Sequence, residues 1–267
     1  MRTTLATWNV NGLRARAAQF LEWIARDRPH VVCLQEIKCK PDQLPPEVHD
    51  APGYWWYWHG AGGYSGVALG VSKELAAERP AFAHPAFDHE TRIVTADLGE
   101  LLVASIYVPN GGKDYAAKLA FLKALGEWAA TQRAAGRRLA LCGDLNVART
   151  DRDVHPKERK PNQIGTRPDE RSLLEGLIAA DLVDVGRTLD PDNDNLFTYW
   201  APWRNLRQRN IGWRIDYILA TGQVAARAAT CKVLAEVGTS DHAPVRAELA
   251  GEAPAAAPAP AAPAPAS

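Results

Sequence analysis

The 267-residue sequence lacks the features of a membrane or secreted protein. No uncharged apolar stretch approaches the roughly 20 residues that span a bilayer, and the start, MRTTLATWNV, has no apolar run of signal-peptide length. Only four cysteines occur, with no C-x-x-C spacing, and Cys33 and Cys142 lie inside apolar runs. We therefore expect a cytoplasmic monomer with reduced structural thiols and no membrane contact.

The motifs of several enzyme classes are also missing. The sequence contains no G-x-S-x-G, no H-E-x-x-H, no Cys/His zinc spacing and no G-x-x-x-x-G-K-[ST]. These absences argue against serine esterases, zinc proteases and nucleotide triphosphate switches.

The sequence has no excess of either charge, because 31 Lys and Arg balance 31 Asp and Glu. Averaged over the molecule, this balance argues against a nucleic-acid partner. Basic residues nevertheless gather between Arg149 and Arg171 and again between Arg204 and Arg214. Each cluster alone is equally typical of a solvated loop.

What the sequence does contain is a series of strand-length apolar runs. They are TLATWNV, HVVCLQE, YWWYW, GVALGV, RIVTADL, LLVASIYV, RLALCGD, RIDYILA, CKVLAEV and PVRAEL. Helix-like segments cover 14–26, 114–133 and 168–180, and the tetrapeptide 98–101 predicts a tight antiparallel hairpin. The expected fold is a four-layer α/β sandwich in which two mixed β-sheets pack face to face with helices outside.

One domain accounts for residues 1–250, since neither a linker nor a repeat divides them. The remaining residues, 251–267, are almost entirely Ala and Pro, a composition that predicts a disordered tail.

Polar residues follow several of these apolar runs. Asn9 and Asn11 end the first run, Glu36 the second, Tyr107 and Asn110 another, and Asp144 and Asn146 a fourth. Strand ends that share one sheet edge place their side chains in one crevice, so four polar ends together indicate a site. Singly, Asn and Asp are common turn residues.

Asp216 lies within an alternating strand pattern, where a partly buried carboxylate needs a metal, an arginine or a histidine as partner. The sequence offers His242 just before the final strand, and a carboxylate on one imidazole nitrogen orients the ring.

The remaining set of Glu36, Asp144, Asp241, Asn9 and Asn146 is rich in oxygen ligands. Such a set suits Mg²⁺, with Mn²⁺ as a substitute, rather than zinc. A hard cation, an amide and a phenol together favour phosphoester hydrolysis.

Seven segments in order resemble exodeoxyribonuclease III and the related abasic-site endonucleases. They are WNVNGLRAR, LQEIKCKPDQLP, YSGVALG, YVPNGG, CGDLNVA, NIGWRIDYIL and TSDHAPV, running from Trp8 to Val245. The wider superfamily of endonucleases, exonucleases and phosphatases shares some of these elements, whereas GWRIDY and QEIKCKPDQLP indicate the DNA-repair branch.

The resemblance implies roles for the site residues. Glu36 would be the principal metal ligand, with Asn9 and Asp241 near the metal. Asp144 would accept a proton from the attacking water or hold a second metal, and His242, oriented by Asp216, would bind the phosphate or act as base. The metal set is Asn9, Glu36, Asp144, Asn146, Asp241 and His242, and the catalytic set is Tyr107, Asp144, Asn146, Asp216 and His242.

The resemblance also implies a DNA-binding set. Trp213 and Ile215 would form an apolar pocket for a flipped-out abasic sugar, and Arg214 would be a strand contact or a surface salt bridge. Asn110 and Lys118 would contact phosphates. Asn11 departs from an aspartate found in some relatives, and the segment APWRNLRQR differs in length, with Trp203 and its arginines near DNA.

The predicted function is therefore Mg²⁺-dependent cleavage of double-stranded DNA 5′ to abasic sites, with trimming or dephosphorylation of blocked 3′ ends. One alternative is a superfamily phosphoesterase acting on inositol phosphates or phospholipids. The other is a DNA-binding module without catalysis.

Overall fold

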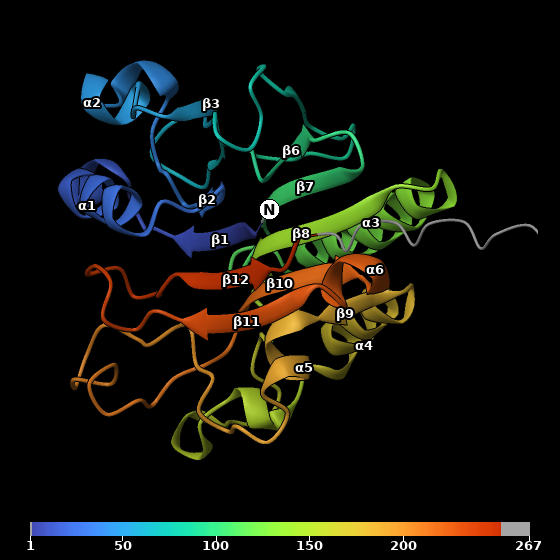
Figure 1. Cartoon of the computed structure of the whole chain (residues 1–267). Coiled ribbons are helices and arrows are strands. Elements are labelled where there is room, and N and C mark those ends of the chain that lie inside the picture. Colours follow the sequence, from blue (N-terminus) through green and yellow to red (C-terminus); the bar gives the residue numbers. More distant parts are fainter. Residues whose placement is uncertain (1, 252–267) are drawn as a thin grey trace, which may run out of the picture.

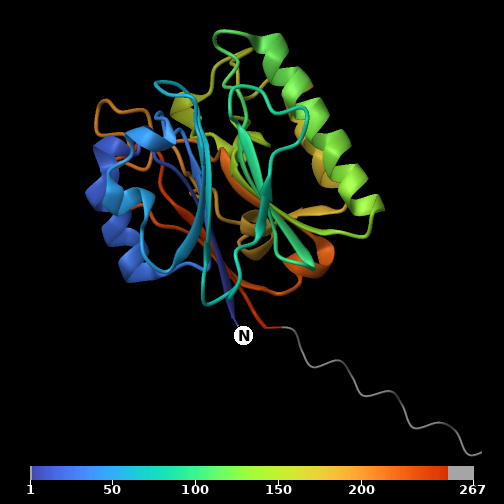
Figure 2. The ribbon, with the colours of Figure 1, turned by 90° about the horizontal axis from the view of Figure 1, so that it is seen from above.

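Two six-stranded β-sheets lie face to face, and helices cover their outer sides (Figure 1). The structure is a computed structural model, and it describes residues 2–251. Seen from above, α1 (Ala17–Asp27) and α2 (Pro46–His49) lie outside one sheet and α3 (Tyr115–Ala134) lies outside the other (Figure 2). The predicted four-layer sandwich of two mixed sheets is confirmed.

The first sheet combines strands from both ends of the chain. Its order is β11 (Ala228–Val233), β12 (Val245–Leu249), β1 (Thr3–Asn9), β2 (Val31–Gln35), β4 (Val67–Ser72) and β3 (Tyr54–His59).

The second sheet is built from the middle of the chain. Its order is β5 (Ala81–Ala83), β6 (Ile93–Asp97), β7 (Leu101–Tyr107), β8 (Arg138–Asp144), β10 (Asp216–Thr221) and β9 (Leu182–Asp184). The other elements are α4 (Pro168–Ala179), α5 (Val185–Leu189), α6 (Gly222–Ala225) and the 3₁₀ turns η1 (Arg14–Arg16), η2 (Pro41–Gln43), η3 (Asp151–Asp153) and η4 (Pro156–Glu158).

Side-chain alternation along the strands produces three layers of core. In β2, Val31 and Cys33 point into the core between the sheets, whereas Val32 and Leu34 pack beneath α1 with Phe20. A third cluster joins the outer face of the second sheet to α3 and α4. Both faces of these strands are buried, which explains why their sequences are continuous apolar runs.

Each sheet has one parallel pair of strands at its centre, joined by a crossover that contains a helix. β1 and β2 flank α1, and β7 and β8 flank α3. Asn9 pairs with Gln35 at the end of the first pair, and Tyr107 pairs with Asp144 at the end of the second. Because the strands of a parallel pair end at one edge, the residues that follow them gather there.

The sequence located most of these elements. All ten apolar runs contain strands, the three helical segments form α1, α3 and α4, and the predicted hairpin joins β6 to β7. The three-residue strands β5 and β9 were not expected.

All four cysteines are free, as predicted. Within residues 2–251 no helix has the length and apolar character needed to cross a membrane. The predicted tail, apart from Gly251, lies outside the described residues.

A candidate phosphoesterase active site

The polar residues predicted at strand ends converge where the two parallel pairs end. Asn9 closes β1, Glu36 follows β2, Tyr107 closes β7 and Asp144 closes β8. Asp216 begins β10 and lies directly opposite Asp144 in the antiparallel register. Both sheets therefore contribute side chains to one crevice.

Asn9 links the two sheets within this site. Its fully buried amide nitrogen donates to Glu36 Oε1 and to Asp144 Oδ2, each at 2.9 Å. Its amide oxygen accepts the backbone N–H of Asn11 at 3.0 Å. The Asn9 oxygen accepts one hydrogen bond and keeps a second lone pair, so its role as a metal ligand stays a prediction. Asn9 also holds two carboxylates in position.

The backbone turns sharply at Glu36, with φ of 52° in the left-handed region. A non-glycine residue there costs roughly 1–2 kcal/mol, and such residues often occur at functional sites. The N–H of Gly12 donates to the Glu36 carbonyl, while Lys38 forms an ion pair with Glu36 Oε2 at 2.6 Å. The turn aims the carboxylate at the crevice instead of continuing the strand.

Asp216 and His242 form the predicted pair. His242 Nδ1 lies 2.9 Å from Asp216 Oδ2, and the same oxygen accepts a 2.6 Å hydrogen bond from the Thr198 hydroxyl. Both members of the pair are almost fully buried. The other ring nitrogen, Nε2, lies 3.9 Å from Asp144 Oδ2, so the imidazole faces the crevice.

Burial and neighbouring charge shift the protonation equilibria of these groups. Burial, together with the charge of Asp216, raises the pKa of Asp144 to about 7. Burial alone would lower the pKa of His242, but the charge and the hydrogen bond of Asp216, together with the charges of Asp144 and Asp241, outweigh burial and raise the pKa to about 10. Burial and the charge of Glu36 also raise the pKa of Tyr107, which therefore remains a hydrogen-bond donor.

The donor set fits a divalent cation. Glu36, Asp144 and His242 each offer a ligand atom, and these atoms all lie within 4.8 Å of one another. Asp216 adds a further buried carboxylate, whose Oδ1 has no hydrogen-bond partner among the described residues. A bound cation would offset this concentration of negative charge, which otherwise favours protonation of Asp144.

Two other predicted metal residues lie at the margin of this group. Asn146 donates from its amide to the Val108 carbonyl at 2.9 Å, and its backbone N–H donates to Asp144 Oδ1. Asp241 Oδ1 accepts from the Asn11 amide at 2.8 Å. Asp241 is not among the three residues, Glu36, Asp144 and His242, whose ligand atoms lie together in the crevice.

Two predicted DNA contacts are buried charges. Lys118 is fully buried, forms an ion pair with Glu170 and donates to the Asn146 carbonyl at 2.7 Å. Arg214 is 4% exposed, and its guanidinium donates to Asp153 at 2.7 Å and to Asp184 at 2.8 and 2.9 Å. Both cations are turned to partners inside the protein, so this structure does not present either of them to a phosphate at the surface.

The predicted apolar pocket residues lie beside the crevice. Trp213 and Ile215 pack in a small cluster with Val154, and Tyr199 packs against it. The Tyr199 ring lies 4.8 Å from the His242 ring, which joins the cluster to the Asp216 pair. Asn110 is exposed in the loop between β7 and α3.

The segment before Asn210 is anchored by one of its arginines. Arg207 donates to the carbonyls of Ala235, Ser240 and Val237, so it fixes the loop rather than facing solvent. Trp203, by contrast, is 58% exposed, as a surface contact residue would be.

Sequence reasoning missed two supporting residues, Thr198 and Arg92. Arg92 is 1% exposed, and its guanidinium lies 4.8 Å from the centre of the Tyr107 ring. The available signal was the position of Arg92 at the start of the apolar run RIVTADL. An arginine buried there needs hydrogen-bond acceptors nearby. Thr198 gave no signal, since it lies in a loop 18 residues before its partner, Asp216.

Comparison with known proteins gives a consistent result. The sequence matches the endonuclease/exonuclease/phosphatase family over residues 6–242. It is 33% identical to the DNA repair nuclease APEX1 of Danio rerio over 92% of this chain and 82% of that protein. It is 31% identical to an exodeoxyribonuclease of Bacillus subtilis over 90% of this chain and 97% of that protein. Recombination repair protein 1 of Drosophila melanogaster is also 33% identical, but the match spans only 36% of its length.

Solved structures agree with the sequence matches. An AP endonuclease from Archaeoglobus fulgidus superposes with a TM-score of 0.82 at 28% identity, covering 92% of this chain and 98% of that one. A 3′ phosphatase from Neisseria, solved with a product DNA hairpin, gives a TM-score of 0.83 at 29% identity, with 92% and 99% coverage.

Proposed function

Since this chain belongs to the endonuclease/exonuclease/phosphatase family, we propose that it is a Mg²⁺-dependent DNA phosphodiesterase of base-excision repair. It would cleave double-stranded DNA 5′ to abasic sites and process 3′ ends as exonuclease and phosphatase. The observation that carries the proposal is the group of Glu36, Asp144 and His242, the last two of them buried, at the meeting point of the two parallel strand pairs.

The side chains have the chemistry that phosphodiester hydrolysis needs. Glu36 would be the principal ligand of a divalent cation, with Asp144 and the charged His242 beside it, and the cation would supply charge stabilisation for the phosphate and the leaving oxygen. The protonated Tyr107 phenol can donate a hydrogen bond to a phosphate oxygen. Asn9 donates a hydrogen bond to Glu36 and another to Asp144. These bonds fix the two carboxylates relative to each other, so the two sheets present one rigid site.

Two residues are candidates for handling the proton of the attacking water. Asp144 has a pKa raised to about 7, which suits an acceptor near neutral pH. His242 is oriented by Asp216 and has a pKa raised to about 10, so at neutral pH it is positively charged and suited to binding phosphate. We propose Asp144 as the proton acceptor and His242 as the phosphate-binding group.

The relatives favour DNA over lipid or inositol phosphates as substrate. Those compared are named as a recombination repair protein, a DNA repair nuclease, an exodeoxyribonuclease, an AP endonuclease and a 3′ phosphatase, and the last was solved with product DNA. The apolar cluster of Trp213 and Ile215 beside His242 is where a base-free sugar could be held. A full-sized base would have to displace these packed side chains.

The decisive experiment is cleavage of a labelled duplex that carries one abasic site. Wild-type protein with Mg²⁺ should nick the damaged strand 5′ to the site, and EDTA should abolish the nick. Glu36→Ala should lose at least about 100-fold in rate while still binding DNA, because a metal ligand is removed. Glu127→Ala makes the same change on the exposed face of α3 and should behave as wild type.

Three results would contradict the proposal. Cleavage in EDTA would exclude the metal site, and binding without cleavage would favour a non-catalytic DNA-binding module. Hydrolysis of an inositol phosphate or a phospholipid, with no action on the duplex, would favour the other branch of the family. Undamaged and 3′-phosphorylated duplexes assayed in parallel rank the exonuclease and phosphatase activities.

A further inference from the structure

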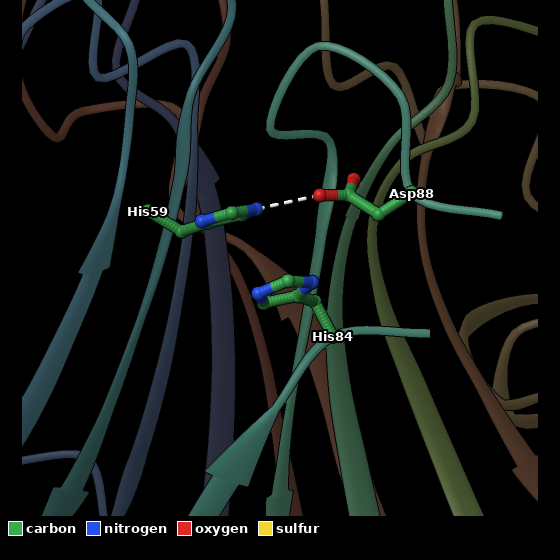
Figure 3. Close-up of side chains that lie close together, drawn as sticks. All are labelled: His59, His84 and Asp88. Carbon is green, nitrogen blue, oxygen red and sulfur yellow. Dashed lines mark hydrogen bonds and ion pairs between the residues drawn. The ribbon is translucent and has the colours of Figure 1, made fainter. Parts of the chain in front are cut away.

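A second group of possible metal ligands lies outside the candidate active site. His59, His84 and Asp88 each offer a ligand atom, and these atoms all lie within 4.8 Å of one another. Figure 3 shows the two imidazole rings stacked, with the Asp88 carboxylate beside them. The ring centroids are 4.6 Å apart and the planes differ by 13°. The three residues come from β3 and from the connection between β5 and β6.

The Asp88 carboxylate is held in position by its surroundings. Its Oδ1 accepts the backbone N–H groups of Arg92 and Ile93 at 2.8 and 3.1 Å, while Oδ2 lies 2.6 Å from His59 Nε2. One oxygen is therefore used by the backbone and the other is presented to the imidazole. Hydrogen bonds of this kind to the non-ligating atom orient carboxylates and imidazoles at metal sites.

Two of the three side chains are largely buried and the third is exposed, as expected for a metal site that is open to solvent. The side chains of His59 and Asp88 are 16% and 9% exposed, whereas His84 is exposed. His84 can rotate at little cost, and an ion can enter from its side. Two fixed ligands and one accessible ligand would leave a coordination position for water.

We propose that His59, His84 and Asp88 bind a divalent transition metal ion of the zinc class. Two imidazoles and one carboxylate favour Zn²⁺, Co²⁺ or Ni²⁺ over Mg²⁺, which prefers oxygen ligands. Bonds of about 2.0–2.1 Å place ligands around a tetrahedral ion roughly 3.3 Å apart. Binding therefore opens the 2.6 Å His59–Asp88 contact slightly and displaces the proton that lies between these two atoms.

The location of the site gives it a structural role. β3 is the edge strand of the first sheet, and β5 is the edge strand of the second. An ion bound by His59 at the end of β3 and by His84 just after β5 joins the two sheets along their shared open side. Tyr57 and Phe82 already stack across the same gap, with ring centroids 5.5 Å apart. The ion acts as a clamp between the sheet edges.

The test uses Co²⁺ as a visible probe of the full-length protein, in the presence of excess Mg²⁺. Glu36→Gln serves as the background that disables the active-site group. One Co²⁺ equivalent should bind to both wild type and Glu36→Gln with visible d–d absorption, and Zn²⁺ should displace it. Saturating Zn²⁺ should raise the melting temperature by about 5 °C in both proteins.

His84→Ala should weaken Co²⁺ binding at least about tenfold and abolish the Zn²⁺-dependent rise in melting temperature. Because the His84 side chain is exposed, this variant should fold as wild type does, and Asp88→Asn provides a second variant. His49→Ala is the matched control, because His49 and Asp50 form an exposed His–Asp pair at 2.7 Å in a different place. This control should bind Co²⁺ as wild type does.

Two outcomes would overturn the inference. If Co²⁺ binding is lost in Glu36→Gln but unchanged in His84→Ala, the ion occupies the candidate active site. If wild type binds no Co²⁺, the stacked histidines are a packing feature only. Neither result depends on whether the protein cleaves DNA, so the inference and the proposed function fail independently.

Discussion

At the scale of single residues, buried charged side chains fix the loops that carry residues of the candidate site. Lys118 is enclosed by Glu170 and the Asn146 carbonyl, so a cation from α3 fixes the loop after β8. Burial lowers the pKa of Lys118, although the charge of Glu170 opposes this effect. Lys118 is therefore a positioning residue, and its effect on DNA should pass through Asn146.

Lys118→Met should destabilise the protein by about 3–5 kcal/mol, because Glu170 would remain buried without its partner. The double variant Lys118→Met/Glu170→Gln should recover much of that loss, as measured by urea unfolding. In the double variant, the dependence of DNA affinity on salt should equal that of wild type. A slope smaller by about 0.9 would mean that Lys118 contacts a phosphate after all.

The sequence predicted single residues well where the chemistry is local. Polar residues after apolar runs identified Glu36, Tyr107 and Asp144, and the need of a buried carboxylate for a partner correctly paired Asp216 with His242. It did not show the burial of Lys118 and Arg214, whose carboxylate partners lie 30 to 61 residues away in the chain or in other elements. Sequence alone does not show which cations face water.

At the scale of elements, the candidate site depends on the close approach of the β7 and β8 backbones. Both strands end in site residues, Tyr107 and Asp144, which are paired in the parallel register. Gly143 permits this approach, because a Cβ at that position would lie 1.9 Å from the Ile106 carbonyl oxygen. The backbone of β7 has no room to move, since β6 lies on its other side.

Gly143→Ala should therefore separate the two strands and displace Asp144. We expect a loss of several kcal/mol in stability and at least about a 100-fold loss of cleavage, because small displacements of catalytic groups have such effects. Gly176→Ala is the matched control, since its Cβ would meet nothing within 4 Å on the exposed side of α4. It should stabilise the protein by up to about 1 kcal/mol, as thermal unfolding would show. Equal behaviour of the two variants would contradict this account.

Element prediction succeeded for long apolar runs and failed for short edge strands. β5 and β9 have only three residues each, too few for a period of two to be recognised. Their places depend on the neighbouring strands, β6 and β10, which supply the hydrogen bonds. Tertiary pairing, not local pattern, defines these two strands.

At the scale of the whole molecule, a buried ion network fixes the long loops beside the second sheet. Arg214 bridges Asp153 of η3 and Asp184 at the end of β9, and Arg187 of α5 also donates to Asp153 at 2.9 Å. The pKa of Asp153 lies below its ordinary value of 3.8. Burial would raise this pKa, but the charge of Arg214 and the hydrogen bonds from Arg214, Arg187 and Thr150 together outweigh burial. The folded state therefore favours the charged carboxylate.

This network predicts a pH dependence of stability. A carboxylate whose pKa falls on folding stabilises the protein above its unfolded pKa, near 4, and that contribution is lost as pH falls through the lower folded value. Asp153→Asn should cost about 3–5 kcal/mol at pH 7, and the difference from wild type should shrink below pH 4. Urea unfolding at several pH values measures the difference in free energy of unfolding between the two proteins.

The control for this prediction is Asp151→Asn, which removes a carboxylate that is 74% exposed and paired with Arg171. It should change the free energy of unfolding by less than about 1 kcal/mol. A difference between Asp153→Asn and wild type that stays constant from pH 7 to pH 3 would exclude the ionised Asp153 as the cause.

The pairing of β1 with β12 has a consequence for synthesis on the ribosome. Thr3 pairs with Leu249 and Thr7 with Val245, so the first strand gains its second neighbour from the last described strand. Until Leu249 has left the exit tunnel, β12 cannot pair with β1. One edge of β1 in the nascent chain is then unpaired, and a strand of another chain can add to it. His242 lies three residues before the start of β12, so His242 and the strand that protects this edge take their places together, after both sheets have been translated.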